Sequence, residues 1–205
     1  MKAYSVKNVL DAKFNCLEFD GMWEMAVGKP EMSGTWAIAG YMKSGKTTFA
    51  MMLAKYLTRF GKVYYNPIEE GFSRSIQMAY ERVNMIEVSG KVIMKKESTE
   101  EMIERLLKHK SPRFAFVDSI QFADLTKKEY KKIKEAFSNK VIIYISHMAG
   151  NNPDGKTAQF ICRDASVLFN IEGHRAFPTS RYGGGQSIDV HKGMAEEYWL
   201  TKNSK

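Results

Sequence analysis

Short apolar runs alternate along the chain with segments in which apolar residues recur every three or four positions. The first apolar run covers residues 35–40 and is followed by a segment of helical period over 45–60. The alternation continues to residue 146, where the sequence reads VIIYIS. Short apolar runs are typical of strands buried on both faces, and the periodic segments are typical of helices. The pattern predicts a mainly parallel sheet with helices on both faces.

The expected elements can be given by residue range. Strands are predicted at 35–40, 62–66, 114–119 and 141–146, and helices at 45–60, 72–83, 98–109 and 126–137. Ser98 and Glu101 have the spacing of a capping box, which favours a helix that begins after residue 98. Gly61 follows the first long helix at a position where glycine often ends helices.

The pattern changes after residue 147. A polar loop is predicted at 148–159, followed by an apolar run at 165–173 and a GGGQS stretch. Because glycine-rich stretches often join antiparallel strands, we expect a C-terminal antiparallel hairpin that ends in the segment EEYWLTK. The first thirty residues are poorly periodic, and we expect Trp23 and Trp36 to pack them against the sheet.

Composition adds a tendency to bind polyanions. The formal net charge of +8 attracts nucleic acid or an anionic membrane surface without specifying either. No apolar run is long enough to cross a bilayer, and the first residues lack the apolar block of a signal peptide, so we expect a cytoplasmic chain with no membrane partner. Cys16 and Cys162 have neither metal-binding spacing nor a disulfide framework, and we expect both to be reduced.

One stretch has the pattern of a phosphate-binding loop. Its residues complete G-x-x-x-x-G-K-[ST] between a predicted strand and a predicted helix. Glycines let backbone N–H groups surround phosphate oxygens, and the lysine reaches the β and γ phosphates. We therefore expect the chain to bind ATP with Mg²⁺. The predicted nucleotide-binding residues are Gly40, Tyr41, Met42, Lys43, Ser44, Gly45, Lys46, Thr47 and Thr48.

Three carboxylates suit the same chemistry. Asp118 ends a strongly apolar strand, where it can hold the Mg²⁺ that the Thr47 hydroxyl also binds; an aspartate at such a position can also cap a helix or form a turn. Glu70, or failing that Glu69, is the candidate to activate water, because both follow the strand at 62–66. The alternative for each glutamate is the first turn of the next helix, where carboxylates suit the helix dipole.

Longer segments resemble a known group of ATPases. KVYYNPIEEGFSRSIQMAYERV is similar to the double-glutamate segment of RadA and KaiC, FVDSIQ resembles IDSIQT of RadA, and YISHMAG is similar to its VGHVTK. The order and spacing of these segments agree as well, and the resemblance covers residues 33–185. The chain therefore resembles the RecA-like P-loop ATPases of the RadA and KaiC type.

The resemblance implies a three-layer P-loop fold and further site residues. It implies that the strand of His147 lies between the strand that leads to Lys46 and the strand of Asp118. His147 matches a residue that senses the γ-phosphate, and Gln121 matches the residue that follows the carboxylate strand. TSRYGGG resembles the KNRFG element of RadA, which makes Arg181 a candidate to reach a neighbouring subunit's nucleotide, although Thr179 and Ser180 replace its Lys-Asn.

The resemblance also implies DNA and a second copy of the chain as partners. In RecA-like proteins, two loops face the axis of a ring or filament; here they are residues 121–128 and 148–159, with Lys156 near the tip of the second. A basic run on the helix at 126–137 is either a phosphate-contacting patch or an ordinary solvated face. It consists of Lys127, Lys128, Lys131, Lys132 and Lys134.

The expected function is Mg²⁺-dependent ATP hydrolysis by a homo-oligomer, coupled to single-stranded or branched DNA. A nucleotide-gated scaffold of KaiC type that acts on a protein partner is the alternative. A small-molecule kinase ranks below both, because residues 138–160 contain no arginine for a phosphate lid.

We expect a single RecA-like domain over 1–205. Residues 1–32 form its lead-in, 33–173 its nucleotide-binding core and 174–205 its C-terminal strands. The zinc-binding and protease-like modules of RadA, and the helical amino-terminal domain of DnaB, do not fit into this length, so a bare ATPase core is expected.

Overall fold

The computed structural model describes residues 3–204. Its strands are β1 (Gly34–Gly40), β2 (Val63–Asn66), β3 (Val92–Met94), β4 (Phe114–Asp118), β5 (Val141–Ala149), β6 (Asn152–Pro153), β7 (Val167–Glu172), β8 (Arg175–Ser180) and β9 (Ile188–Asp189). Its helices are α1 (Val6–Leu10), α2 (Gly21–Val27), α3 (Lys46–Leu57), α4 (Arg74–Arg82), α5 (Thr99–Leu107), α6 (Lys127–Ala136), α7 (Lys156–Asp164) and α8 (Lys192–Asn203), with a short 3₁₀ helix, η1, at Met85–Val88. Within residues 3–204, no helix has both the length and the apolar character needed to cross a membrane.

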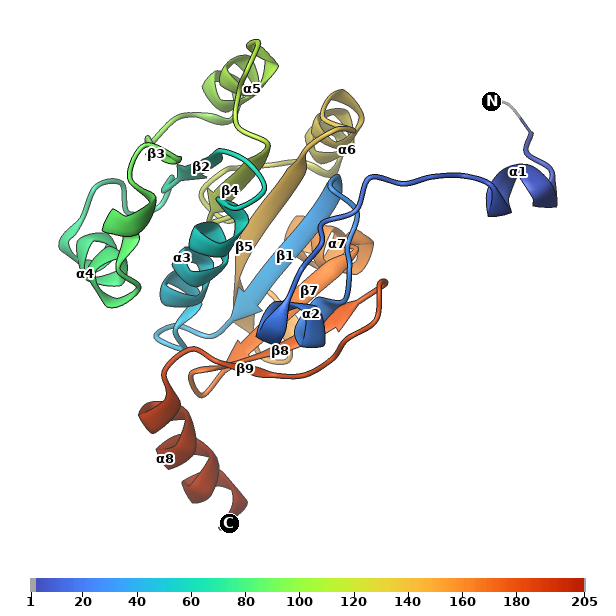
Figure 1. Cartoon of the computed structure of the whole chain (residues 1–205). Coiled ribbons are helices and arrows are strands. Elements are labelled where there is room, and N and C mark those ends of the chain that lie inside the picture. Colours follow the sequence, from blue (N-terminus) through green and yellow to red (C-terminus); the bar gives the residue numbers. More distant parts are fainter. Residues whose placement is uncertain (1–2, 205) are drawn as a thin grey trace.

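The described strands form one sheet whose main path runs β3-β2-β4-β5-β1-β7-β8-β9, with β6 paired to the end of β5. The strands from β3 to β7 along this path are parallel, and β8 and β9 are added antiparallel. Figure 1 shows β5 and β1 at the centre of the sheet. The predicted sheet, its antiparallel hairpin and the position of β5 between β4 and β1 are confirmed.

Helices cover both faces of this sheet (Figure 1). Successive residues of β4 point to opposite faces, so that Phe116 joins the core under α2, α3 and α4 while Val117 joins the core under α5, α6 and α7. In β5, Ile143 joins the core under α2, α3 and α4, and Tyr144 joins the core under α5, α6 and α7. Both faces are buried, which explains why these strands read as continuous apolar runs.

The lead-in packs through aromatic side chains, as expected. The Trp23 ring stacks on Tyr56 of α3 with ring centres 5.2 Å apart, and Phe19 meets Trp36 of β1 edge-on at 6.2 Å. Residues 3–14, which we call the arm, differ from the rest of the lead-in. They leave the body of the molecule, and α1 lies far from the sheet (Figure 1).

Several expected boundaries were wrong. The segment EEYWLTK is not a strand but part of α8, and the hairpin is formed by β7 and β8 instead. The loop predicted at 148–159 is shorter, because α7 begins at Lys156. α3 ends at Leu57 with Thr58 as its C-cap, so Gly61 lies beyond the helix end.

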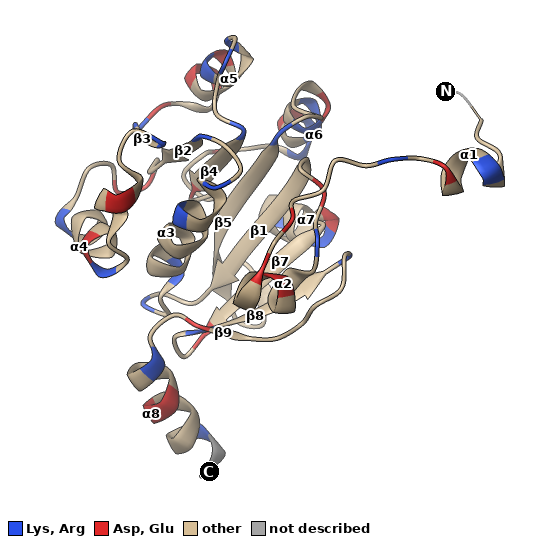
Figure 2. Ribbon diagram, viewed as in Figure 1, with Lys and Arg blue, Asp and Glu red and all other residues tan. Residues whose placement is uncertain are grey.

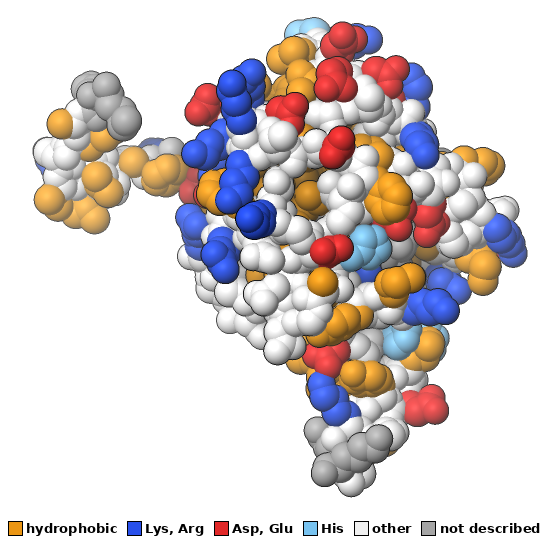
Figure 3. Space-filling view, turned by 180° about the vertical axis from the view of Figure 1, so that it is seen from behind, with side chains coloured by type: hydrophobic (Ala, Val, Ile, Leu, Met, Phe, Trp, Pro, Cys, Tyr) orange, Lys and Arg blue, Asp and Glu red, His pale blue; other side chains and the backbone are white. Residues whose placement is uncertain are grey.

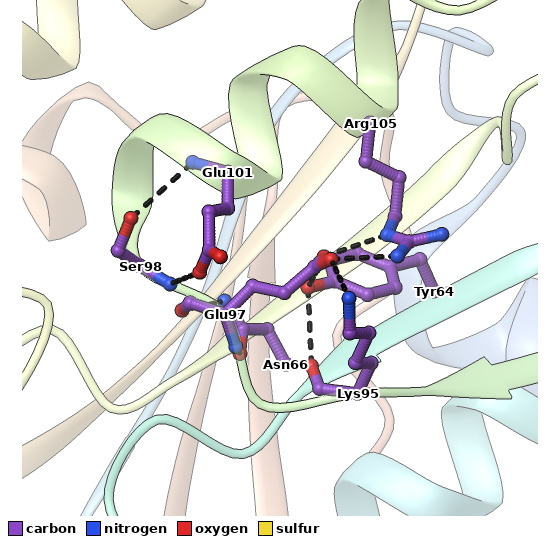
Figure 4. Close-up of polar contacts among 7 residues, drawn as sticks. All are labelled: Tyr64, Asn66, Lys95, Glu97, Ser98, Glu101 and Arg105. Carbon is purple, nitrogen blue, oxygen red and sulfur yellow. Dashed lines mark hydrogen bonds and ion pairs between the residues drawn. The ribbon is translucent and has the colours of Figure 1, made fainter.

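The capping box predicted at the start of α5 is present, and it adjoins a buried carboxylate. The Glu97 side chain is 4% exposed and accepts two hydrogen bonds of 2.6 Å from Arg105 and one of 2.7 Å from the Tyr64 hydroxyl. Lys95 lies 2.9 Å from the same carboxylate, and Asn66 exchanges hydrogen bonds with the Glu97 backbone (Figure 4). This network ties α5 to the end of β2.

Glu97→Gln is expected to lower the free energy of unfolding by about 3 kcal/mol at pH 7. Hydrogen bonds from Arg105 are the main reason why the pKa of Glu97 falls to about 2 from 4.5, and each tenfold change in proton affinity corresponds to about 1.4 kcal/mol. Because the folded-state pKa is depressed, this stability is present above pH 4.5 and is lost as the pH falls through 2. Urea unfolding at stepped pH should show the two proteins converging at low pH.

The matched control for this experiment is Glu104→Gln, on the same helix. Glu104 is exposed, and substitutions at such positions change stability by about 0.5 kcal/mol or less. An equal loss in both variants would contradict the role given to the network.

Candidate nucleotide-binding site

The phosphate-loop residues connect the end of β1 to the start of α3. Gly40 closes β1, and a Cβ there would lie 2.6 Å from the carbonyl oxygen of Ile171 and 2.8 Å from the Ser44 hydroxyl, so only glycine fits. Gly45 caps α3 at a φ of 100°, a left-handed conformation that suits glycine. The sequence pattern is therefore required by the local backbone.

Two polar groups in this loop are buried. The Lys46 ammonium donates a hydrogen bond of 2.7 Å to the carbonyl oxygen of Tyr41, and burial lowers the pKa of Lys46 while Asp118 and Glu69 raise it. The Ser44 hydroxyl is buried without a hydrogen-bond partner among the described residues. Buried groups of this kind are normally satisfied, and phosphate oxygens would accept hydrogen bonds from both. The residues of the loop thus fit a nucleotide.

Asp118 ends β4 at the same edge of the sheet. Its partner in β5 is Ile145, and Gly40 is paired with His147 two residues further along β5. The Tyr65 hydroxyl donates a hydrogen bond to the Asp118 carboxylate. Burial raises the pKa of Asp118 to about 6 against this hydrogen bond, and the negative charge of Glu69 adds to the rise. A divalent cation bound here would stabilise the charged form.

Glu69 is held at this edge by two side chains from neighbouring strands. Its Oε2 atom accepts a hydrogen bond of 2.8 Å from the Ser119 hydroxyl and lies 2.8 Å from Nε2 of His147. Its backbone N–H donates to the carbonyl oxygen of Asp118. Nδ1 of His147 is buried and has no hydrogen-bond partner within residues 3–204. The carboxylate and imidazole therefore form a pair beside Asp118.

Glu70 lies in a different environment from Glu69. It is exposed, and its carboxylate accepts hydrogen bonds from the hydroxyls of Ser73 and Ser75 at the start of α4. Ser73 is the N-cap of that helix. α4 begins at Arg74 and has no carboxylate in its first turn, so neither glutamate takes the position at the helix dipole that the sequence left open, and Glu69 instead meets His147.

Gln121 links the loop after β5 to this edge. Its amide donates hydrogen bonds to the Ser146 hydroxyl at 3.0 Å and to the carbonyl oxygen of Asp154 at 2.8 Å, and its oxygen accepts from the His147 backbone at 3.3 Å. A second link joins the phosphate loop to the same segment, because the Tyr41 hydroxyl donates to the carbonyl oxygen of Gly150.

Arg181 is not brought to this edge within the chain. It follows β8 and its backbone N–H binds the carbonyl oxygen of Ser166, beside the first residues of β1. β1 spans 34–40, so about 20 Å of strand separates Arg181 from the phosphate loop of the same copy. Its action on a neighbouring subunit's nucleotide stays a prediction.

A groove of about 760 Å³ adjoins the phosphate loop. It begins at Thr48, in the first turn of α3, and runs along that helix past Met52, with Val190 and His191 also in its lining. The His191 Nδ1 accepts a hydrogen bond from the backbone of Met194 at the start of α8. Thr47 is half-buried in the same turn of α3.

Sequence reasoning missed three residues of this site. Ser119 and Tyr65 orient the carboxylates, and His191 lies beside the groove. Ser119 follows Asp118 directly and could have been suspected from its position. Tyr65 and His191 carry no signal in the sequence, because only the fold brings them near the loop.

Solved structures share the fold of this chain. The ATPase domain of G40P matches with a TM-score of 0.56 at 14% identity, covering 80% of this chain and 84% of that chain. A KaiC-like protein from Pyrococcus horikoshii OT3 matches with a TM-score of 0.58 at 17% identity, covering 85% and 94%. The flagellar accessory protein FlaH from Methanocaldococcus jannaschii matches with a TM-score of 0.61 at 12% identity, covering 87% and 96%.

Sequence comparison adds nothing to these likenesses, since no family model and no curated protein matches the chain. At 12 to 17% identity the solved structures establish the fold. The chain has the RecA-like fold that the sequence segments indicated.

Proposed function

We propose, from the RecA-like fold and the geometry of the site, that the protein binds ATP with Mg²⁺ and hydrolyses it. One observation carries the proposal: Lys46, Asp118 and the Glu69–His147 pair converge at the carboxyl edge of four adjacent strands, β2, β4, β5 and β1. Ligands of open α/β sheets bind outside this edge. A buried lysine, a carboxylate and a base beside one phosphate loop are the groups that phosphoryl transfer to water requires.

Each residue has a distinct role in the proposed reaction. Glu69 accepts a proton from water, whose oxygen forms a bond to the γ-phosphorus as the bond to the leaving ADP breaks. His147 and Ser119 hold Glu69 in place, and Lys46 stabilises charge on the β and γ phosphates. Thr47 and Asp118 would hold Mg²⁺, which neutralises phosphate charge when bound.

The nucleoside of ATP is proposed to enter the groove that begins at Thr48. This groove adjoins the phosphate loop, and its lining combines the apolar side chains of Met52 and Val190 with the imidazole of His191. Because Nδ1 of His191 accepts a backbone hydrogen bond, Nε2 carries the proton in the neutral ring and is free to donate to a base or ribose oxygen.

The test is phosphate release by the purified protein with ATP and Mg²⁺, with and without single-stranded DNA. Hydrolysis that DNA stimulates supports coupling to nucleic acid. Hydrolysis without any effect of DNA, with an oligomeric state that follows the bound nucleotide, favours the KaiC-like scaffold that acts on a protein partner. Absence of hydrolysis under all conditions would remove the proposed activity.

We also propose that the protein forms a homo-oligomer through its arm. Tyr4, Val6, Leu10 and Phe14 are 65 to 79% exposed, and no residue of α1 is buried against the rest of the described chain. Soluble chains rarely leave so many large apolar side chains uncovered in one segment. A helix of five residues is also too short to be stable without packing, so a second copy is the proposed partner.

Deletion of the arm is expected to reduce the oligomer to smaller species without unfolding the domain. Residues 3–14 bury none of their side chains against the described body, so the thermal midpoint should change little. Light scattering after gel filtration measures the mass. Lys7→Ala, which keeps the apolar side chains, is the control and should leave the mass unchanged; an unchanged mass after deletion would contradict the role of the arm.

A further inference from the structure

The basic run of α6 lies against α7 and forms a seam between the two helices. α6 follows the loop from β4, which contains Gln121, and α7 follows the segment after β5, the strand whose end carries His147. Both helices cover the same face of the sheet. The seam therefore starts at the edge that carries the candidate site and runs along the outside of the molecule.

Contacts fix how the two helices meet. The ammonium groups of Lys127 and Lys131 lie 5.3 and 5.7 Å from the centre of the Phe160 ring. One turn further along, Lys134 forms an ion pair of 2.6 Å with Asp164. Lysines at i, i+4 and i+7 share one face of a helix, so α6 presents a row of cations to α7 about 10 Å long.

Most cations of this surface are free to bind a ligand. No carboxylate of residues 3–204 lies within ion-pair distance of the following side chains: Lys127, Lys128, Lys131, Lys132, Lys156 and Arg163. Figure 2 marks the basic residues on α6, and Figure 3, seen from behind, shows Lys and Arg side chains gathered down the side that carries α6 and α7.

The chemistry of the seam favours nucleic acid over other polyanions. The exposed large apolar side chains of the described residues all lie outside α6 and α7, so the seam has neither an apolar anchor for a membrane nor a hot spot for a protein. A row of cations without carboxylate partners is the arrangement that binds the repeated backbone phosphates of a single strand.

We propose that the seam binds the sugar-phosphate backbone of single-stranded nucleic acid, with Lys127 and Lys131 held on Phe160 as its central phosphate contacts. The coupling of this binding to hydrolysis rests on the proposed function; the binding itself does not. Gln121 supplies the physical link, because it contacts the backbone of both His147 and Asp154, on the loop before α7.

The test is fluorescence anisotropy of a labelled thymidine 30-mer, titrated at several KCl concentrations without nucleotide and again with ATP. For Lys127→Ala/Lys131→Ala, the slope of log K against log salt should fall by about 1.4, since each single-strand phosphate contact contributes about 0.7. Lys62→Ala/Lys108→Ala, which removes two exposed lysines elsewhere, should keep the wild-type slope. Phe160→Leu should weaken binding while all lysines remain.

The outcomes separate this inference from the proposed activity. Basal hydrolysis of the Lys127→Ala/Lys131→Ala variant, measured without nucleic acid, should equal that of the wild type. An unchanged slope in that variant, or equal losses in the control, would overturn the inference whatever the ATPase result. Binding to phosphatidylserine vesicles that depends on these lysines, without oligonucleotide binding, would overturn it as well. Oligonucleotide binding without any hydrolysis would leave it standing and remove the proposed activity alone.

Discussion

Replacement of Lys46 by alanine is expected to lower the rate of ATP hydrolysis by about 100- to 1000-fold, the usual cost of removing a group that stabilises transition-state charge. The Lys46 ammonium is buried beside Asp118, and its one hydrogen bond within the described residues is to the Tyr41 carbonyl, so phosphate oxygens are the acceptors that this position suits. Nucleotide binding should weaken too, because the lysine meets phosphates in the ground state. Phosphate release and binding of a fluorescent ATP analogue measure the two effects.

The control for the lysine is Lys62→Ala, which removes an exposed cation outside the loop and should leave both quantities unchanged. Thermal unfolding midpoints of both variants show whether a loss of activity comes from the missing lysine or from unfolding of the domain. Wild-type hydrolysis in folded Lys46→Ala protein would mean that the nucleotide binds elsewhere on the molecule.

Glu69→Gln is expected to lower kcat by about 100- to 10,000-fold, the range that general-base catalysis supplies, while ATP remains bound. Glutamine keeps an oxygen to accept the hydrogen bond from Ser119 but cannot accept a proton from water. Glu70→Gln is the matched variant, one residue away. Because the Glu70 carboxylate is exposed and bound by Ser73 and Ser75, its loss should change kcat by less than about tenfold.

Single-turnover hydrolysis with both variants decides between the two glutamates. The opposite ranking, with Glu70→Gln inactive and Glu69→Gln active, would show that the loop after β2 rearranges when nucleotide binds. Equal losses would assign the proton transfer to both carboxylates. Only a large loss confined to Glu69→Gln agrees with the pairing of Glu69 and His147 seen here.

Local patterns in the sequence were sufficient to predict those features whose residues lie close together in the chain. The spacing of Gly40, Gly45 and Lys46 predicted a phosphate loop, because glycines that permit a tight backbone and a lysine that reaches phosphates must be close in sequence. The capping box of Ser98 and Glu101 was predicted for the same reason and is present. Apolar runs identified the central strands, since burial on both faces removes polar residues from them.

The C-terminal segment shows where such patterns are insufficient. Tyr198 and Trp199 favour a strand by propensity, yet they lie in α8. The Trp199 ring packs on Phe177 of β8 with ring centres 5.3 Å apart, and Tyr198 lies over Gly173, where any side chain would collide with it. These contacts join residues distant in sequence, and they outweigh a propensity difference of at most about 1 kcal/mol per residue.

The sequence by itself determined the fold class, the phosphate loop and the candidacy of Asp118 and His147, because each depends on a short motif or on a resemblance in segment order. Only the tertiary structure decided that Glu69 meets His147 while Glu70 is bound by two serine hydroxyls at the start of α4, and that Arg181 lies at the opposite edge of the sheet from the loop. The reason is geometric: adjacent glutamates have the same chemistry, and only strand register and packing determine which carboxylate faces a partner from another strand.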